Sequence, residues 1–162
     1  MASSSSTTSQ TPNTAELDVP LHSLGFQFDA LSPFSVSGHI LVTPKCCQPF
    51  KVLHGGVSAL IAEGLASIGA YLASDMKRVA GINLSIDHVK SAPIGDLVVA
   101  EATPLSCGRT IQVWEVTLWK ADPSSMKREH LISSSRVTLV CNLHVPEHMK
   151  DVSRPFRKYA KL

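Results

Sequence analysis

One stretch of the sequence limits the possible folds of this chain more than any other. Residues 57–73 are almost uncharged and rich in alanine, and Glu63 is their only carboxylate. This pattern predicts a helix that is apolar on nearly every side, and such a helix belongs in the centre of a fold. Its 17 residues fall short of the ~20 that span a bilayer, so we expect no membrane span.

Most of the remaining sequence has the pattern of β-strands. Ile82, Leu84 and Ile86 alternate with polar residues, as in a strand with one buried face. Consecutive strands, rather than strict alternation of strands and helices, indicate an α+β fold with an antiparallel sheet. The lone apolar helix can be hidden only if that sheet curves around it. The further predicted strands are residues 34–43, 97–103, 110–120 and 131–143.

The two ends of the chain depart from this pattern. Residues 1–15 are small and polar and cannot bury enough apolar surface to become ordered, so we expect a disordered tail. Beyond Pro146 the chain becomes polar and basic, and residues 146–162 are predicted to extend from the fold. The sequence therefore indicates one folded domain over residues 16–145.

The composition excludes several classes of function. A formal net charge of +2, without a cluster of basic and aromatic residues, does not fit a nucleic-acid-binding protein. The sequence has no Cys-x-x-Cys pair, so we expect its cysteines to be buried thiols in a reducing compartment. These cysteines are Cys46, Cys47, Cys107 and Cys141. No glycine-rich phosphate loop is present, and we expect neither a metal nor a bound cofactor.

Glu63 is the candidate catalytic group. No other charge in residues 57–73 marks a solvated face, so a glutamate that simply points to solvent is the less favoured interpretation. An isolated carboxylate among apolar side chains often marks a functional site, where it can act as a general base or a nucleophile. The sequence therefore predicts that Glu63 faces a reacting group.

The residues just before the predicted helix can stabilise negative charge. Gly55 and Gly56 let a ligand approach the backbone, and N–H groups at a helix N-terminus favour an oxygen that gains negative charge. A Gly-Gly pair alone would be only a turn. Together with Gln48, His54 and Glu63, the pair favours a site that polarises a thioester carbonyl.

The spacing of these groups predicts a homodimer. Glu63 lies about seven residues into the helix from Gly56, which is roughly 10 Å along the helix axis. One carbonyl carbon therefore cannot touch both the helix start and Glu63 of the same helix. Two antiparallel helices in a symmetric dimer would combine Gly55 of one subunit with Glu63 of the other. Ser67, four residues after Glu63, shares its face and could hold the carboxylate or a water.

These motifs resemble the hotdog-fold thioesterases of the phenylacetyl-CoA and 4-hydroxybenzoyl-CoA type. The resemblance is carried by Q-P-F-K-V-L-H-G-G-V-S-A-L-I-A-E-G-L-A-S and then by I-N-L-S-I-D-H-V-K-S-A, and it covers roughly residues 20–145. It implies a hotdog fold, in which a long antiparallel sheet wraps around one central helix. It also implies assembly into a dimer or a dimer of dimers, with the site at the subunit interface.

The resemblance further implies the reaction and the roles of the residues. Glu63 would be the nucleophile or general base in the hydrolysis of an aromatic acyl-CoA. The Gly55 N–H would polarise the thioester carbonyl, and Ser67 would assist the glutamate or water. Gln48 and His54 would help to place the acyl group. The preferred acyl group stays open between naphthoyl, benzoyl and aliphatic chains.

Two polar segments are candidates for binding CoA. One follows the strand after the helix and the other is a turn between two later strands, and both could meet phosphates or the pantetheine arm. From the residues alone, ordinary solvated loops are an equally good interpretation. With the resemblance, the candidate contacts to CoA and substrate are Gly56, Asn83, His88, Val89, Lys90, Ser91, Ser106, Gly108, Arg109 and Thr110.

Two other functions compete with thioester hydrolysis. A hotdog hydratase or dehydratase would add or remove water across a carbon–carbon bond, but the expected Asp-x-Asn-Pro-x-His run is absent from the sequence. A non-catalytic acyl-CoA binder would not need the isolated carboxylate of Glu63. Hydrolysis is therefore the favoured interpretation.

The last three residues are a candidate targeting signal. Ala160, Lys161 and Leu162 resemble the small-basic-leucine address that the peroxisomal import receptor reads. Arg157 and Lys158 nearby fit this interpretation, and a disordered end would keep the tripeptide accessible. The sequence therefore predicts a peroxisomal protein.

Overall fold

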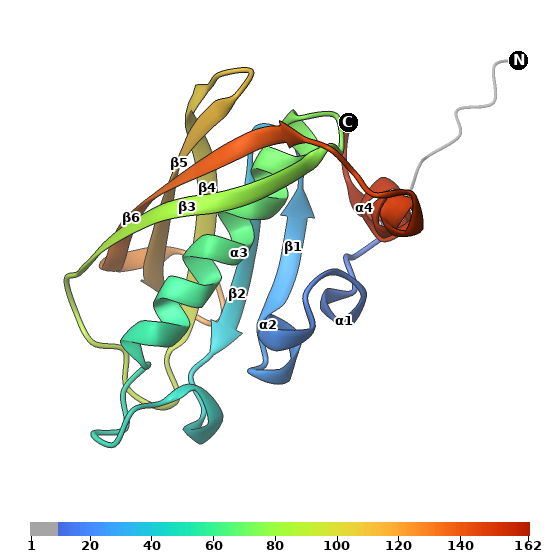
Figure 1. The fold of residues 1–162 in the computed structure, drawn as a ribbon. Helices are drawn as coiled ribbons and strands as arrows, with labels where there is room; N and C mark the ends of the chain where they lie inside the picture. The colour runs from blue at the N-terminus through green and yellow to red at the C-terminus, as the bar shows by residue number, and fades with distance from the viewer. Residues whose placement is uncertain (1–9) are drawn as a thin grey trace, which may run out of the picture.

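Helix α3 (Gly55–Ala73) lies at the centre of the computed structural model, which describes residues 10–162. A six-stranded antiparallel sheet curves around it in the order β1-β2-β4-β5-β6-β3, as Figure 1 shows. The predicted α+β fold, with an antiparallel sheet around one apolar helix, is confirmed. Residues 1–9, part of the predicted tail, lie outside the described residues.

The strands fall where the sequence patterns placed them, except the first. No strand was predicted at β1, which forms one edge of the sheet next to β2. The other edge is β3, which follows α3 directly in the chain. The bounds are β1 (Gln27–Leu31), β2 (Val36–Leu41), β3 (Arg78–His88), β4 (Leu97–Cys107), β5 (Ile111–Ala121) and β6 (Arg128–Leu143).

The core forms where α3 meets the concave face of the sheet. Ile61 and Leu65 of α3 and Trp114 of β5 are fully buried in one hydrophobic cluster. Gly69 allows the Trp114 ring to lie against the helix, because a Cβ at Gly69 would come 2.5 Å from its Cη2 atom. Gly64 instead makes room for a second helix, since a Cβ there would lie 2.9 Å from Cδ1 of Leu21.

Helix α3 is also long and apolar enough to cross a bilayer, by length and composition alone, and no other helix in residues 10–162 is. Inside the fold, 56% of its apolar window is buried. This enclosure by the sheet is what the sequence predicted for the helix. The cysteines agree with prediction only in part, because Cys46 and Cys141 are buried whereas Cys107 is exposed.

Strand β3 is an edge strand that pairs only with β6. A register shift between Gly81 and Asn83 marks a β-bulge, and Ile82 is 58% exposed. The prediction that Ile82 faces the core is therefore wrong, because the bulge breaks the alternation of the strand. Gly81 on one side of the bulge and Leu84 on the other both lie toward the helix and core.

Two short helices precede the sheet, α1 (Thr14–Leu17) and α2 (Val19–Ser23). Asn13 caps α1, and the buried Thr14 hydroxyl accepts a hydrogen bond of 3.0 Å from the Phe28 N–H. The predicted tail therefore ends too late at residue 15. Caps and a buried hydrogen bond, rather than apolar side chains, hold this polar segment in place.

The C-terminal residues fold back as a short 3-10 helix, η2 (Glu147–Val152), and a final helix, α4 (Ser153–Tyr159). Phe156 and Tyr159 are buried against the core, and the Lys161 N–H donates to the Leu31 carbonyl oxygen at 2.9 Å. The prediction that residues 146–162 extend from the fold is wrong. This segment does have apolar residues at helical spacing, but the many polar residues between them obscured the pattern in the sequence.

Candidate active site

Glu63 lies in the middle of α3 and faces strand β3. Its carboxylate rests against the backbone of Gly81, where any Cβ would collide with it. It also lines a cavity of about 650 Å³ together with Ser67 and Tyr71 of the same helix. Because the cavity opens beside it, Glu63 is half-buried rather than fully enclosed within one chain.

The start of α3 offers one free backbone donor. The N-cap residue is His54, whose ring Nδ1 accepts the Gly56 N–H at 2.8 Å. The Gly55 N–H has no acceptor among the described residues. At a helix N-terminus such a free donor attracts an oxygen that carries negative charge. The Gly55 amide therefore fits the predicted role, while the Gly56 amide is already used by the cap.

His54 has a structural task that its predicted role in placing the acyl group did not include. As the N-cap it has an extended backbone, with φ −66° and ψ 130°, and its side chain satisfies one of the open N–H groups of the helix. The cap requires an unprotonated Nδ1 facing Gly56, which leaves the Nε2 side of the ring available to other groups. His54 is thus positioned by the helix that it caps.

His88, at the end of β3, reaches the same helix start. A Cβ on Gly55 would lie 3.0 Å from Nε2 of His88, so the imidazole is in contact with this glycine. The next two residues are tied to the sheet, since the Val89 and Lys90 N–H groups both donate to the Ile132 carbonyl oxygen, at 2.8 and 3.2 Å. The predicted CoA segment from His88 to Ser91 is thus exposed and lies next to Gly55.

Gln48 is held in the loop before α3. An isolated bridge between Cys47 and Leu53 closes this loop, and the Gln48 Oε1 accepts the Phe50 N–H at 2.5 Å. In this arrangement the amide supports the turn. Gln48 lies close in the chain to the helix start, but its side chain is engaged within its own loop.

Ser67 lies one helical turn after Glu63 and lines the same cavity. No hydrogen bond joins the Ser67 hydroxyl to the Glu63 carboxylate among the residues that the structure describes. Both groups are half-buried and open to the same space. The arrangement allows both to face a water or a substrate oxygen at once, which is one of the two roles predicted for Ser67.

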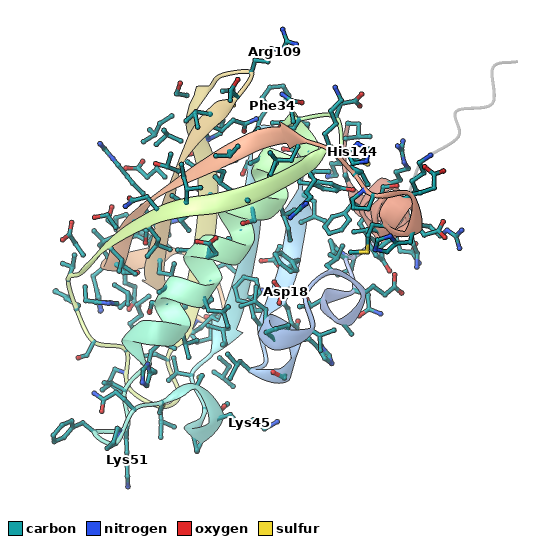
Figure 2. The ribbon with its side chains drawn as sticks, viewed as in Figure 1. Asp18, Phe34, Lys45, Lys51, Arg109 and His144 are labelled. Carbon is teal, nitrogen blue, oxygen red and sulfur yellow. The ribbon has the colours of Figure 1, made fainter. Side chains whose placement is uncertain are left out.

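The second predicted CoA segment, Ser106 to Thr110, lies at the other end of the molecule. Figure 2 shows Arg109 and Lys51 at opposite ends, with α3 running between them. This turn is held to the end of β6, because the Cys141 N–H donates to the Thr110 carbonyl oxygen at 2.7 Å and the Asn142 side chain donates to that of Arg109. Within one chain the two predicted CoA segments do not meet. Asn83 is exposed on the edge strand, apart from both.

A single chain does not assemble the predicted catalytic groups. Glu63 follows Gly55 by eight residues on one helix, which corresponds to about 12 Å at the rise of an α-helix. The structure divides the groups into two sets: Gly55, His54 and His88 at the helix start, and Glu63 with Ser67 beside the cavity. In residues 10–162 no group of three or more His, Cys, Asp or Glu side chains could hold a metal ion.

Two features of this site were not predicted. Gly81 makes room for the Glu63 carboxylate, and this role becomes visible only in the structure, where Gly81 lies beside the bulge of β3. The cavity wall opposite α3 comes from the C-terminal segment, including Met149, Val152 and Phe156. The spacing of these apolar residues, at intervals of three and four, was the sequence signal that could have found this wall.

Comparison with known proteins identifies the family. A sequence profile described as Thioesterase superfamily matches residues 50–127, which include the loop before α3, the whole helix and strands β3 to β5. The chain is 57% identical over 143 residues to 1,4-dihydroxy-2-naphthoyl-CoA thioesterase 2 of Arabidopsis thaliana, covering 88% of this chain and 91% of the relative. The chain belongs to the Thioesterase superfamily.

More distant relatives agree with this assignment. A 1,4-dihydroxy-2-naphthoyl-CoA hydrolase of Escherichia coli is 30% identical over 116 residues, which is 71% of this chain and 80% of the relative. A solved thioesterase structure from Haemophilus influenzae matches with a TM-score of 0.68 and 32% identity, over 80% of this chain and 86% of that one. The predictions of a hotdog fold and of an acyl-CoA thioesterase are thereby confirmed.

Proposed function

We propose that this chain hydrolyses 1,4-dihydroxy-2-naphthoyl-CoA to 1,4-dihydroxy-2-naphthoate and CoA, a step that would serve phylloquinone biosynthesis. The observation that carries the proposal is Glu63 in the wall of a largely apolar cavity of about 650 Å³. Cavities of this size and character bind drug-sized ligands, and a bicyclic aromatic ring fits within that range. The names of the Arabidopsis and Escherichia coli relatives point to the same acyl group.

The active unit is a homodimer that joins the two separated sets of groups. Strand β3 is a long edge strand, and an open edge is a template for pairing with another strand. Its first half, at Gly81, lies against Glu63, and its end, at His88, lies against Gly55. Antiparallel pairing of two β3 strands about a two-fold axis places the Gly81 half of one strand beside the His88 half of the other. Glu63 of one subunit thereby approaches Gly55 of its partner.

In this dimer each group has a defined task. The Gly55 N–H donates to the thioester carbonyl oxygen and stabilises the negative charge that it gains. Glu63 of the other subunit either attacks the carbonyl carbon or removes a proton from the water that does so. The carbon–sulfur bond then breaks, the CoA thiolate takes a proton, and water supplies the hydroxyl of the new carboxylic acid. Neither metal nor cofactor takes part in this scheme.

The CoA moiety spans more than one chain in this scheme. His88 to Ser91 lie beside Gly55 and are positioned to contact the pantetheine arm or phosphates of the same substrate. The turn around Arg109 is at the far end of α3, so it reaches a site only when it comes from a neighbouring copy. A dimer of dimers would supply that copy.

A complementation experiment tests the shared site. Glu63→Gln removes the carboxylate at constant shape, and Gly55→Pro removes the proposed N–H donor. Because a Cβ at this position also comes 3.0 Å from Nε2 of His88, Gly55→Ala, which adds the Cβ and keeps the N–H, is the control. Proline is tolerated at the first helical position, and the extended backbone of His54 suits a residue that precedes proline. Glu63→Gln and Gly55→Pro should each lose thioesterase activity when expressed alone. A co-expressed mixed dimer should regain it, because one of its two sites combines an intact Gly55 with an intact Glu63.

The readout is release of CoA thiol from a panel of naphthoyl, benzoyl and fatty acyl-CoA substrates, with the composition of the mixed dimer verified by two different affinity tags. Mixed dimers that stay as inactive as the parent variants would exclude a shared site. Preference for a fatty acyl-CoA in the wild-type panel would exclude the proposed substrate while leaving the thioesterase assignment in place.

We also propose that Ala160, Lys161 and Leu162 direct the protein to the peroxisome. Lys161 and Leu162 are exposed, but the Lys161 N–H is bonded to the Leu31 carbonyl oxygen and Tyr159 is buried. A receptor that reads an extended C-terminus must therefore release this end from β1. An N-terminal fluorescent fusion should be punctate in plant cells, and deletion of the tripeptide should leave it in the cytosol. Puncta that persist after the deletion would contradict the proposal.

A further inference from the structure

The cavity beside Glu63 has two main walls from distant parts of the chain. One wall is the face of α3 that carries Glu63, Ser67 and Tyr71, and the other includes Met149 and Val152 of the C-terminal segment, residues 145–162. The sequence match to the Thioesterase superfamily covers residues 50–127 and therefore describes the first wall but not the second. The second wall is a feature of this chain that the family profile does not describe.

The C-terminal wall carries an apolar stripe that is covered at one end only. Met149, Val152, Phe156 and Tyr159 follow one another at intervals of three and four residues. Phe156 and Tyr159 are 9% and 8% exposed, whereas Met149 and Val152 are 46% and 47% exposed. Binding of an apolar ligand is favourable where it displaces water from uncovered apolar surface in a cavity.

The covered end fixes the wall in place. The Phe156 ring packs edge-on against Tyr71 of α3, with ring centroids 5.1 Å apart. The Tyr159 hydroxyl donates to Glu16 at 3.0 Å, and the Lys158 ammonium lies 3.5 Å from the same carboxylate. These contacts join the segment to both α3 and α1. Met149 and Val152 are thus held across the cavity from the catalytic face of the helix.

The position of Glu63 determines which part of a substrate enters this space. The thioester carbon must lie near the carboxylate, so the acyl group extends from there into the cavity between the two walls. The side chains around it are mainly apolar, and Ile68, Tyr71 and Val79 are among them. An aromatic ring buried there would contact Met149 and Val152 on its far side.

We propose that residues 145–156 form the specificity wall of the acyl site, and that Met149 and Val152 set the size of the ring that the enzyme accepts. The inference rests on the proposed thioesterase function and adds the element that selects the acyl group. The short segment that carries the targeting tripeptide at its end therefore also shapes the active site. Selectivity among aryl-CoA substrates is expected to change with this segment while the chemistry at Glu63 does not.

The test compares two tryptophan substitutions in the same segment. Val152→Trp fills the cavity from a partly exposed position, and Lys150→Trp adds the same ring at an exposed residue that does not line the cavity. The kcat/KM ratio of 1,4-dihydroxy-2-naphthoyl-CoA to benzoyl-CoA should fall about tenfold in Val152→Trp, mainly through KM, because a filled pocket excludes the larger ring first. The ratio should stay within twofold of wild type in Lys150→Trp.

Three results would overturn the inference. The ratio could be unchanged in both variants, or it could fall equally in both. In the third, Val152→Trp changes the oligomeric state, measured by light scattering, but leaves selectivity unchanged. That result would mean that a second copy of the chain covers Met149 and Val152. Thermal unfolding of each variant confirms that the compared proteins are folded.

A binding measurement separates this inference from the proposed function. The probe is the stable acid 1-hydroxy-2-naphthoate, titrated into wild-type protein with labelled methionine methyl groups. A shift of the Met149 resonance that is lost in Val152→Trp supports the wall even if no acyl-CoA is hydrolysed. Hydrolysis without any shift of Met149, and with unchanged selectivity in Val152→Trp, refutes the wall and leaves the thioesterase assignment standing.

Discussion

Helix α3 and the C-terminal segment face each other across one cavity, but they are held in different ways. Helix α3 contacts strands β2 to β6, and its buried side chains belong to the central core. The C-terminal segment is attached through two buried aromatic rings and a few hydrogen bonds. A segment with so few buried contacts can open by itself, whereas a core helix is lost only with the whole fold.

The difference assigns separate tasks to the two walls. The proposed catalytic carboxylate stands on the core helix, where it lies against Gly81 of the sheet. The proposed specificity wall stands on the segment that can change or detach without unfolding the rest. Chemistry and selectivity can therefore vary independently in this architecture, and the substitutions below test that separation.

The largest effect is expected at the catalytic face of α3. Glu63→Gln should lower kcat by about 10² to 10⁴-fold, the range for loss of a positioned acid or base. The matched control is Glu115→Gln, which removes a half-buried carboxylate from the middle of β5, outside the residues that line the cavity. The control should keep wild-type activity in a thiol-release assay.

The same two variants also show whether a loss of activity comes from a change in structure. Circular dichroism and light scattering should show an unchanged fold and oligomeric state in Glu63→Gln, because glutamine keeps the shape of glutamate. Wild-type turnover in this variant would refute the assignment of Glu63. Equal loss in Glu115→Gln would attribute the effect to general destabilisation.

The second prediction compares the stability of the two walls directly. Leu65→Ala, at a fully buried position of α3, should lower the global free energy of unfolding by about 2–5 kcal/mol. Phe156→Ala should instead release the C-terminal segment and leave the main unfolding transition nearly unchanged. Denaturant unfolding measures the first effect, and trypsin cleavage after Arg157 or Lys158 measures the second. A global loss in Phe156→Ala as large as in Leu65→Ala would refute the independence of the segment.

Sequence alone predicted the α3 side of this comparison well. Nearly uniform apolarity around a single carboxylate identified the buried helix, and two-residue alternation identified most strands. Both signals are strong because they repeat over many residues. The position of Gly55 at the helix start, on which its proposed role depends, was also predicted, because it is a local property of the chain.

The C-terminal wall was not predicted, because its few apolar residues are separated by many polar ones. Phe156 and Tyr159 are two aromatic residues in a stretch rich in Lys and Arg, and its average polarity conceals their spacing. Likewise, nothing local marks Gly81 as the neighbour of Glu63, because that contact depends on a bulge that shifts the register of β3. Long-range contacts of this kind arise from tertiary packing and are not encoded by local periodicity.

The third prediction tests how closely the sheet fixes the catalytic wall. Gly81→Ala introduces a Cβ that collides with the Glu63 carboxylate, so the side chain must move away from its present position. A displacement of about 1 Å at a reacting group can cost up to 100-fold in rate, and we expect a fall in kcat of about tenfold. Ser85→Ala, at an exposed position of the same strand, is the control. Unchanged kcat in Gly81→Ala would mean that β3 does not position Glu63.

The smallest effect is expected at the attachment of the C-terminal segment. Tyr159→Phe removes only the hydroxyl that donates to Glu16 at 3.0 Å, which should weaken docking of the segment by about 1 kcal/mol. Hydrogen exchange of the Lys161 amide, bonded to the Leu31 carbonyl oxygen, should then become about fivefold faster. The Leu53 amide, bonded to the Ala92 carbonyl oxygen, reports on the core and should not change. Faster exchange at both amides would show that the segment and the core open together, and the proposed division between a fixed catalytic wall and a detachable specificity wall would then be wrong.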